Sequence, residues 1–294
     1  MSKQHTEGES TPSKNRRTVF LVVFVVCLVA AAAAAGFLVR YWLVRQEAED
    51  VYNSLQEEVS AVDEPEPEES QAEEIVLEEE MTREIDFADL QTNTNEDIYA
   101  WISIPDTNID YPIVQHPTDD TYYLNYNLDG TAGLPGTIYT ELANAKDFSD
   151  FNTVIYGHNM QNGTMFQNLH NYSDGTFFEE HPYVYIYLED STLKYQVYAA
   201  YEYTNVHMLY AFDYSTEEGR QEFLSEIAGL RSLTYIYDDT VEVTTDSHVL
   251  TLSTCVHDVP EKRWSTRSMP PSTSTPTTFS EEGNIDEQIY RAYL

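Results

Sequence analysis

His248-Val249-Leu250-Thr251-Leu252-Ser253-Thr254-Cys255 is a run of β-branched and apolar residues that predicts a strand in a mainly β fold. Side chains alternate between the two faces of a strand, so Ser253 and Cys255 share one face while Leu250 and Leu252 share the other. The thiol therefore lies on the less apolar face, which favours a cleft over the core. Because Cys255 is the only cysteine outside the apolar N-terminal segment, it is either a buried small hydrophobe or a free reactive group.

Two other residues complete the set that a reactive thiol needs. Val154-Ile155-Tyr156-Gly157-His158 places a histidine just after another short apolar strand, and Arg263 follows Cys255 by eight residues. Thiol acyl transfer needs a nucleophile, a proton shuttle and a donor for the oxyanion. Arg263 cannot lose its charge, which suits it to the last of these roles. The alternative for His158 is an ordinary loop histidine on the surface.

Short β-type runs separated by turn residues dominate the chain from Leu90 onward, and they predict a closed or nearly closed β-barrel with added helices. One helix is predicted after Ser215 or Thr216, with an apolar stripe through Phe223 and Ile227. Another is predicted over residues 95–102 from the spacing of its apolar residues. Besides the strand that ends at Cys255, the predicted strands are Ile109–Val114, Gly136–Tyr139, Thr153–Tyr156, Tyr183–Leu188, Leu193–Tyr203 and Val241–Thr245.

An uncharged apolar run covers Thr18 to Val39, roughly the 20 residues that a helix needs to cross a bilayer. We expect a transmembrane anchor over residues 18–39. Basic residues precede the run, at Lys14, Arg16 and Arg17, so residues 1–17 are expected in the cytoplasm and the bulk of the chain outside. A cleaved signal peptide is the alternative, although the run exceeds the usual apolar length of such peptides.

Acidic residues dominate beyond this segment. The chain has 51 Asp and Glu against 15 Lys and Arg, and residues 47–89 hold 18 acids and a single base, Arg83. This charge density predicts an extended or partly helical stalk over residues 40–89. Residues 90–263 then form one globular domain with a core. The acidity argues against nucleic acid as a partner. No metal or cofactor is expected, because the remaining histidines lack metal-ligand spacing.

Several further segments precede the thiol in a fixed order. They are Asn95-Glu96-Asp97-Ile98-Tyr99-Ala100-Trp101-Ile102, Asp110-Tyr111-Pro112-Ile113-Val114-Gln115, Tyr122-Tyr123-Leu124, Asn152-Thr153-Val154-Ile155-Tyr156-Gly157-His158-Asn159-Met160 and Met165-Phe166-Gln167-Asn168-Leu169. With Thr251–Cys255, Arg263 and the helix after Ser215, they resemble the class B sortases, the membrane-anchored cysteine transpeptidases of Gram-positive bacteria. The resemblance covers about residues 95–263.

This resemblance implies an eight-stranded sortase-type β-barrel and a transpeptidation outside the cell. Cys255 would attack the threonine carbonyl of a sorting signal near the C-terminus of a secreted protein, with His158 exchanging protons and Arg263 binding the oxyanion. Ser253 and Thr254 are expected to contact the substrate, with packing an equal alternative for Ser253. A peptidoglycan or pilin amine would then resolve the acyl-enzyme. The expected partners are therefore proteins with a sorting signal and an amine-bearing acceptor.

The tail over residues 264–294 departs from the family pattern. Trp264-Ser265-Thr266-Arg267-Ser268-Met269-Pro270-Pro271 lacks apolar alternation and leads into a tract rich in Ser, Thr and Pro. We therefore expect no normal closing strand. Either the barrel is incomplete or the reading frame shifts near this point. A rival function follows, that of a catalytically impaired, membrane-anchored barrel that binds a partner without turnover.

Overall fold

The computed structural model describes residues 14–60, 83–204, 206–230, 235–255, 262–269 and 292–293, with the backbone alone for residues 14–18, 60, 204, 255, 262–269 and 292–293. The chain divides into two compact units, Met1–Glu47 and Ala48–Leu294.

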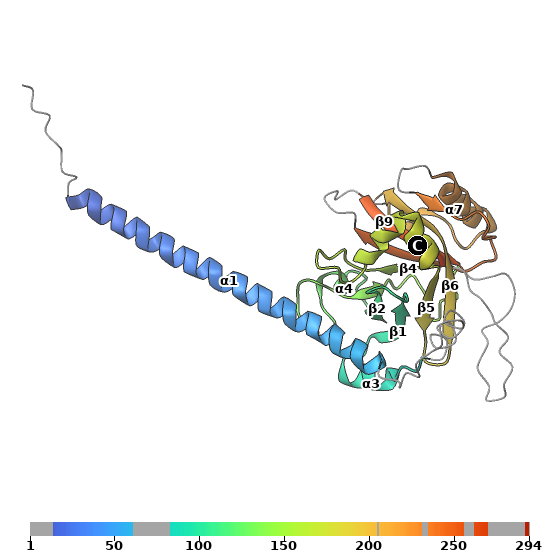
Figure 1. The fold of residues 1–294 in the computed structure, drawn as a ribbon, viewed down its shortest axis with the longest axis horizontal. Helices are drawn as coiled ribbons and strands as arrows, with labels where there is room; N and C mark the ends of the chain where they lie inside the picture. The colour runs from blue at the N-terminus through green and yellow to red at the C-terminus, as the bar shows by residue number, and fades with distance from the viewer. Residues whose placement is uncertain are drawn as a thin grey trace, which may run out of the picture. The chain divides into compact units, whose positions relative to one another are not determined.

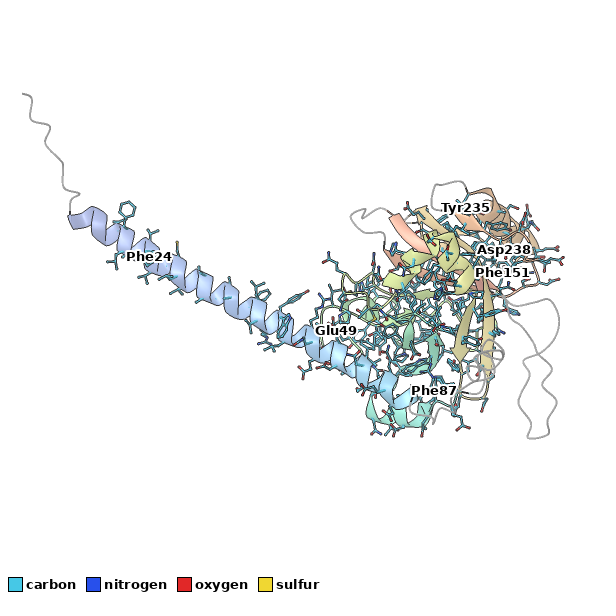
Figure 2. The ribbon with its side chains drawn as sticks, in the orientation of Figure 1. Phe24, Glu49, Phe87, Phe151, Tyr235 and Asp238 are labelled. Atoms are coloured by element: carbon cyan, nitrogen blue, oxygen red, sulfur yellow. The ribbon has the colours of Figure 1, made fainter. Side chains whose placement is uncertain are left out.

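The first unit is the greater part of helix α1 (Lys14–Ser60), and it carries the apolar run. Large apolar side chains along this section are exposed, among them Phe20 and Phe24, the second of which is labelled in Figure 2. By length and composition this section of α1 can cross a membrane. It is a candidate membrane anchor, as the sequence predicts, and its orientation stays a prediction.

The second unit is built on a closed sheet (Figure 1). The strands run in the order β9-β8-β4-β3-β2-β1-β5-β6, and a further pairing of β9 with β6 joins the two ends. The eight-stranded barrel expected from the sequence is therefore confirmed. Its strands are β1 (Ile98–Ser103), β2 (Asp110–Val114), β3 (Ile138–Thr140), β4 (Asn152–Tyr156), β5 (Tyr183–Tyr187), β6 (Thr192–Thr204), β8 (Val249–Cys255) and β9 (Lys262–Met269), with short additions at β7 (Ile236–Tyr237) and β10 (Ala292–Tyr293).

Helices connect the strands. The longest of them in the second unit is α7, which follows Thr216 as predicted: the Thr216 hydroxyl accepts a hydrogen bond from the Gly219 amide, and Phe223 and Ile227 are fully buried. Their apolar stripe is what docks the helix on the core. The helical elements are α3 (Phe87–Asn93), α4 (Tyr122–Asn125), the 3₁₀ helix η1 (Gln167–Ser173), α5 (Gly175–Glu180), α6 (Met208–Ala211) and α7 (Glu217–Gly229).

Both faces of the central strands are covered. On β8 the side chains of Leu250, Thr251 and Leu252 are all fully buried, so the polar face predicted for this strand is not open to solvent along its length. Thr251 is satisfied there by a 2.7 Å hydrogen bond to the Asn152 side chain on β4. Figure 2 shows Phe151, which precedes β4, within the same packed body.

Two local predictions are wrong. The expected helix over residues 95–102 is largely strand β1, because Trp101 pairs with Pro112 on one side and Tyr187 on the other, and these ladders outweigh local helical spacing. The expected strand Val241–Thr245 contains no strand. Its end is instead a turn, in which the Thr244 amide donates a 3.1 Å hydrogen bond to the Ser247 hydroxyl.

The expectation of a missing closing strand is also wrong. Residues 262–269 form β9, which pairs with β8 from Leu250↔Ser268 to Cys255↔Arg263 and with β6 along its other edge. Ladders on both edges pair the backbone groups of this segment, so it forms a strand without apolar alternation. The two prolines follow the end of β9 and remove no donor from it. They lie outside the described residues, as does most of the rest of the tail.

The expected stalk is packed at its beginning. Within the second unit, Tyr52, Leu55 and Val59 of α1 are 4, 5 and 8% exposed and belong to the barrel's core cluster. Arg83 forms a bidentate ion pair with Asp110 of β2, at 2.7 and 3.0 Å. Three apolar side chains at helical spacing were enough to dock this acidic segment. Residues 61–82 lie outside the described residues, and the domain boundaries stay a prediction.

Candidate active site

The candidate site lies where parallel strands β4 and β8 end together. Tyr156 of β4 pairs with Ser253 of β8, and the Gly157 amide continues the ladder with a 3.1 Å bond to the Ser253 carbonyl. Cys255 follows Ser253 by two residues, and His158 follows Tyr156 by two. Because both strands run in the same direction, His158 and Cys255 leave the sheet at the same level of its carboxyl edge.

Strand β9 brings Arg263 to the same edge. Arg263 is the residue opposite Cys255 in the antiparallel β8–β9 pair. Directly opposed residues of such a pair are separated by about 4.5–5.5 Å at Cα. The three residues singled out from the sequence therefore lie on three adjacent strands or strand ends, although nearly a hundred residues separate His158 from Cys255 along the chain.

A backbone carbonyl holds the imidazole of His158. Its Nε2 lies 2.7 Å from the carbonyl oxygen of Leu124 in α4. A carbonyl oxygen only accepts, so Nε2 carries the hydrogen in the neutral ring and Nδ1 has the free lone pair. Figure 1 shows α4 close to the sheet that bears β4. Leu124 belongs to one of the sequence motifs, but the sequence predicts no role for it. Any residue type has a main-chain carbonyl, so the identity of the residue does not reveal such a contact.

Two glycines allow close approach around this histidine. A Cβ on Gly157 would lie 2.5 Å from Ile138 and 2.7 Å from Phe166, so no larger residue fits before His158. Gly136 has a φ of +69° and lies against the ring itself, since a Cβ there would come within 2.9 Å of His158 Cδ2. Gly157 belongs to the Tyr-Gly-His motif of the sequence. The sequence predicts no role for Gly136.

The loop after His158 is fixed at its backbone. The His158 carbonyl accepts a 3.0 Å bond from the Phe166 amide, and Asn159 pairs with Met165 in an isolated bridge. Met165 has a φ of +57°, a left-handed conformation that costs energy for a side chain of this size. Tertiary contacts around residues 158–166 therefore determine where the histidine lies.

Ser253 and Thr254, the expected substrate contacts, are 5 and 2% exposed. The Thr254 hydroxyl has no hydrogen-bond partner within the part of the chain that the structure describes. The Ser253 carbonyl is used by Gly157. This burial is what packing beside the thiol would give, and substrate contact by either residue stays a prediction.

A second polar pair lies at the end of β3. His207 Nε2 is 3.0 Å from Glu141 Oε1, and the carboxyl is largely buried while the imidazole is half-exposed. Burial raises the pKa of Glu141 above its ordinary value, and the nearby His207 offsets this only in part. The pair connects the residue before α6 to the strand that neighbours β4.

A hollow of about 530 Å³ lies among the described residues, lined by residues 91–97 at and after the end of α3, His116, the start of α4 and residues 128–130, and its lining contains neither His158 nor any residue of β8 or β9. No group of three or more potential metal ligands was found among the residues whose placement is described.

Comparisons with known proteins identify the family of this chain. A family model described as the sortase domain matches residues 102–269, which runs from β1 to the end of β9. Sortase B of Listeria monocytogenes is 32% identical over 170 residues, which are 58% of this chain and 67% of that protein. Sortase B of Staphylococcus aureus is 30% identical over 161 residues, 55% of this chain and 64% of that protein.

The solved structures include a Staphylococcus aureus sortase B–substrate complex, which superposes with a TM-score of 0.60 at 26% identity over 76% of this chain and 96% of that one. The matched region contains Cys255 on β8, Arg263 on β9, and His158 two residues after the end of β4. The family match covers more than half of the chain, and the named relatives are all of class B. The chain therefore belongs to the sortase family of cysteine transpeptidases, in its class B branch.

Proposed function

We propose that this chain cleaves a C-terminal sorting signal after threonine and transfers the acyl group to a cell-wall or pilin amine. The observation that supports this most directly is the register of three strands. Cys255 stands opposite Arg263 across β8–β9, while the β4–β8 ladder carries His158 to the same edge.

In the first half-reaction the Cys255 thiolate attacks the threonine carbonyl carbon. A thiol is only a few per cent ionised at neutral pH, so the positive charge of Arg263 favours the reactive form. The carbonyl oxygen becomes an oxyanion, to which the guanidinium donates. The Cys255 thiol gives its proton to Nδ1 of His158, the nitrogen left free by the Leu124 carbonyl, and the imidazolium passes that proton to the departing amine as the threonine C–N bond breaks.

In the second half-reaction an incoming amine attacks the thioester carbon. Its proton passes to His158, the C–S bond breaks, and Cys255 is regenerated as a thiolate. Attack by water instead would release the free acid, so the balance between transfer and hydrolysis depends on which nucleophile reaches the thioester. A primary amine from a peptidoglycan stem, a cross-bridge or a pilin lysine fits this step, and the proposal extends to each.

We place the reaction outside the cell, with α1 as the anchor. The basic residues before the apolar section support a cytoplasmic N-terminus. The rival function, a barrel that binds without turnover, rested on the absence of a closing strand. Since β9 is present and carries Arg263, that argument no longer favours the rival.

The test is trapping of the acyl-enzyme. The chain is incubated with a library of sorting-signal peptides, with and without an amine, and intact mass is measured. We expect a mass increase equal to the peptide up to threonine, which the amine discharges as a joined product. Cys255→Ala should give neither species, whereas Cys27→Ala, which removes the thiol in the apolar section, should give both. Acylation in the Cys255→Ala chain would disprove the assignment of the nucleophile.

A further inference from the structure

Tyr52 of α1 reaches from the membrane-proximal helix into the barrel. Its side chain is 4% exposed, and its hydroxyl donates a 2.8 Å hydrogen bond to the carbonyl of Gly136. Its ring packs edge-on against Tyr111 of β2, with centroids 5.7 Å apart. Burial raises the pKa of Tyr52, so the hydroxyl keeps its proton and remains a donor.

Gly136, whose carbonyl accepts this hydrogen bond, lies against the imidazole ring of His158. Gly136 approaches the imidazole so closely that a Cβ there would meet His158 Cδ2 at 2.9 Å and Nε2 at 3.2 Å. A shift of the Gly136 backbone therefore changes the space in which the ring sits. The Tyr52 hydroxyl is hydrogen-bonded to the backbone carbonyl of Gly136 and therefore limits this shift.

The same segment also holds α4 in place. The Thr137 amide donates to the Tyr123 carbonyl at 3.0 Å, and the Thr137 hydroxyl donates to the Tyr126 carbonyl at 3.0 Å. Between these two anchors lies Leu124, whose carbonyl bonds His158 Nε2. Fixing residues 136–137 thus fixes the acceptor that sets the tautomer of the ring.

A second set of contacts leads from Tyr52 to the same residue. The hydroxyl of Tyr111, on which Tyr52 packs, accepts a 3.0 Å bond from the Met165 amide. Met165 is paired with Asn159, and the next amide, that of Phe166, bonds the His158 carbonyl. The ring of Tyr52 therefore supports the backbone of His158, while its hydroxyl supports the side chain.

We propose that Tyr52 is a positioning residue for His158, so that docking of the membrane-proximal part of α1 holds the imidazole in the tautomer and place that acyl transfer requires. The inference rests on the proposed role of His158. Its consequence is that residues which the sequence assigns to an unpacked stalk control the turnover of the barrel.

Tyr52→Phe in the full chain is the central variant. It keeps the ring against Tyr111 and removes the hydroxyl, which donates to the Gly136 carbonyl and also lies 3.3 Å from the Thr137 hydroxyl. Tyr172→Phe is the matched control: the Tyr172 side chain is fully buried, and its hydroxyl donates to the His181 carbonyl at the same distance, 2.8 Å, away from His158. Each variant loses one buried hydroxyl–carbonyl bond, so both melting temperatures should fall alike, by about 3 °C.

Two measurements in detergent micelles separate positioning from stability. We expect kcat to fall about tenfold for Tyr52→Phe with KM unchanged. A 1 Å displacement of a catalytic group costs about 10²-fold in rate, and loss of the Tyr52 hydroxyl should move the imidazole by less than that. Tyr172→Phe should keep the wild-type kcat. In ¹⁵N spectra of the imidazoles without substrate, Tyr52→Phe should lower the fraction of His158 protonated at Nε2 when neutral, and Tyr172→Phe should not.

The outcomes distinguish this inference from the proposed function. If the wild-type chain forms no acyl-enzyme, the proposed function fails, and the imidazole spectra still report on the contact between Tyr52 and His158. If the wild type turns over and Tyr52→Phe matches Tyr172→Phe in kcat, the positioning role is overturned. An unchanged His158 tautomer in Tyr52→Phe overturns it as well, even if kcat falls.

Discussion

Cys255 and Arg263 are directly opposite each other in the antiparallel pair formed by the last two strands of the barrel. This pairing makes the position of the arginine a property of the sheet, whereas the eight-residue separation in sequence leaves it undetermined. The backbone of Arg263 belongs to a strand that is hydrogen-bonded along both edges, to β8 and to β6. For the oxyanion role proposed for Arg263, this means that the backbone carrying the donor does not have to reorganise as charge develops.

Arg263→Ala should therefore lower kcat by about 10²–10³, the usual loss on removal of one oxyanion donor. Arg267→Ala is the control, since Arg267 lies on the same strand but pairs with Thr251, four residues before the thiol. Stopped-flow acylation with a sorting-signal peptide measures both. Equal losses in the two variants would show that β9 tolerates no truncation and that the effect is not specific to the site.

The sequence predicted those parts of the fold whose pattern is local. The capped helix after Thr216 and the strand through Thr251 carry their signals within a dozen residues, and both were found. β9 was missed because its stability comes from two neighbouring strands rather than from its own alternation. For the same reason β1, which is paired on both sides, was mistaken for a helix.

The candidate site divides in the same way. Chemistry and the surrounding motifs predict Cys255, His158 and Arg263 as the site, and the structure brings their backbones to one edge. The contacts that hold the histidine were not predictable, since the Leu124 carbonyl and the close approach of Gly136 depend on backbone geometry alone. Tyr52 was hidden in an acidic segment 84 residues away from its acceptor.

Gly157→Ala should destabilise the domain and lower turnover together. The new methyl group would overlap Ile138 and Phe166 in the core, which costs about 1–3 kcal/mol in overpacking, or about 5 °C in melting temperature. Gly175→Ala is the control, because no atom lies within 4 Å of a Cβ at that position. A wild-type melting curve for Gly157→Ala would contradict the packing described around His158.

Glu141→Gln tests the buried carboxyl beside His207. Because burial raises the pKa of Glu141 in the folded state, its contribution to stability is present below the ordinary pKa of 4.5 and is lost as pH rises through the folded pKa. The stability of Glu141→Gln relative to the wild type should therefore increase with pH from about 4.5 upward. Urea melts at a series of pH values measure this difference.

Asp119→Asn makes the same change from carboxyl to amide, but its effect on stability should depend on pH in the opposite direction. Hydrogen bonds from the Thr121 amide and hydroxyl hold the pKa of Asp119 below its ordinary value, so its contribution is present at neutral pH and is lost in acid. The stability of Asp119→Asn relative to the wild type should thus increase as pH falls. Parallel trends in the two variants would refute the direction assigned to Glu141.

Thr266→Pro tests whether β9 closes the barrel. Thr266 pairs with Leu252 on β8 and with Ala200 on β6, so it is in the interior of the sheet, where a residue without an amide hydrogen is excluded. Leaving one partner unsatisfied costs about 1–3 kcal/mol, and the added strain should lower the melting temperature by about 5 °C or more. Thr266→Val keeps the amide and the branched side chain, and should melt like the wild type.

Amide exchange should also quicken around Leu252 and Ala200 in the proline variant alone. Because Arg263 lies three residues earlier on the same strand, acylation should fall with it. A proline variant that melts and acylates like the wild type would mean that the barrel does not depend on β9 and that Arg263 is positioned by something else.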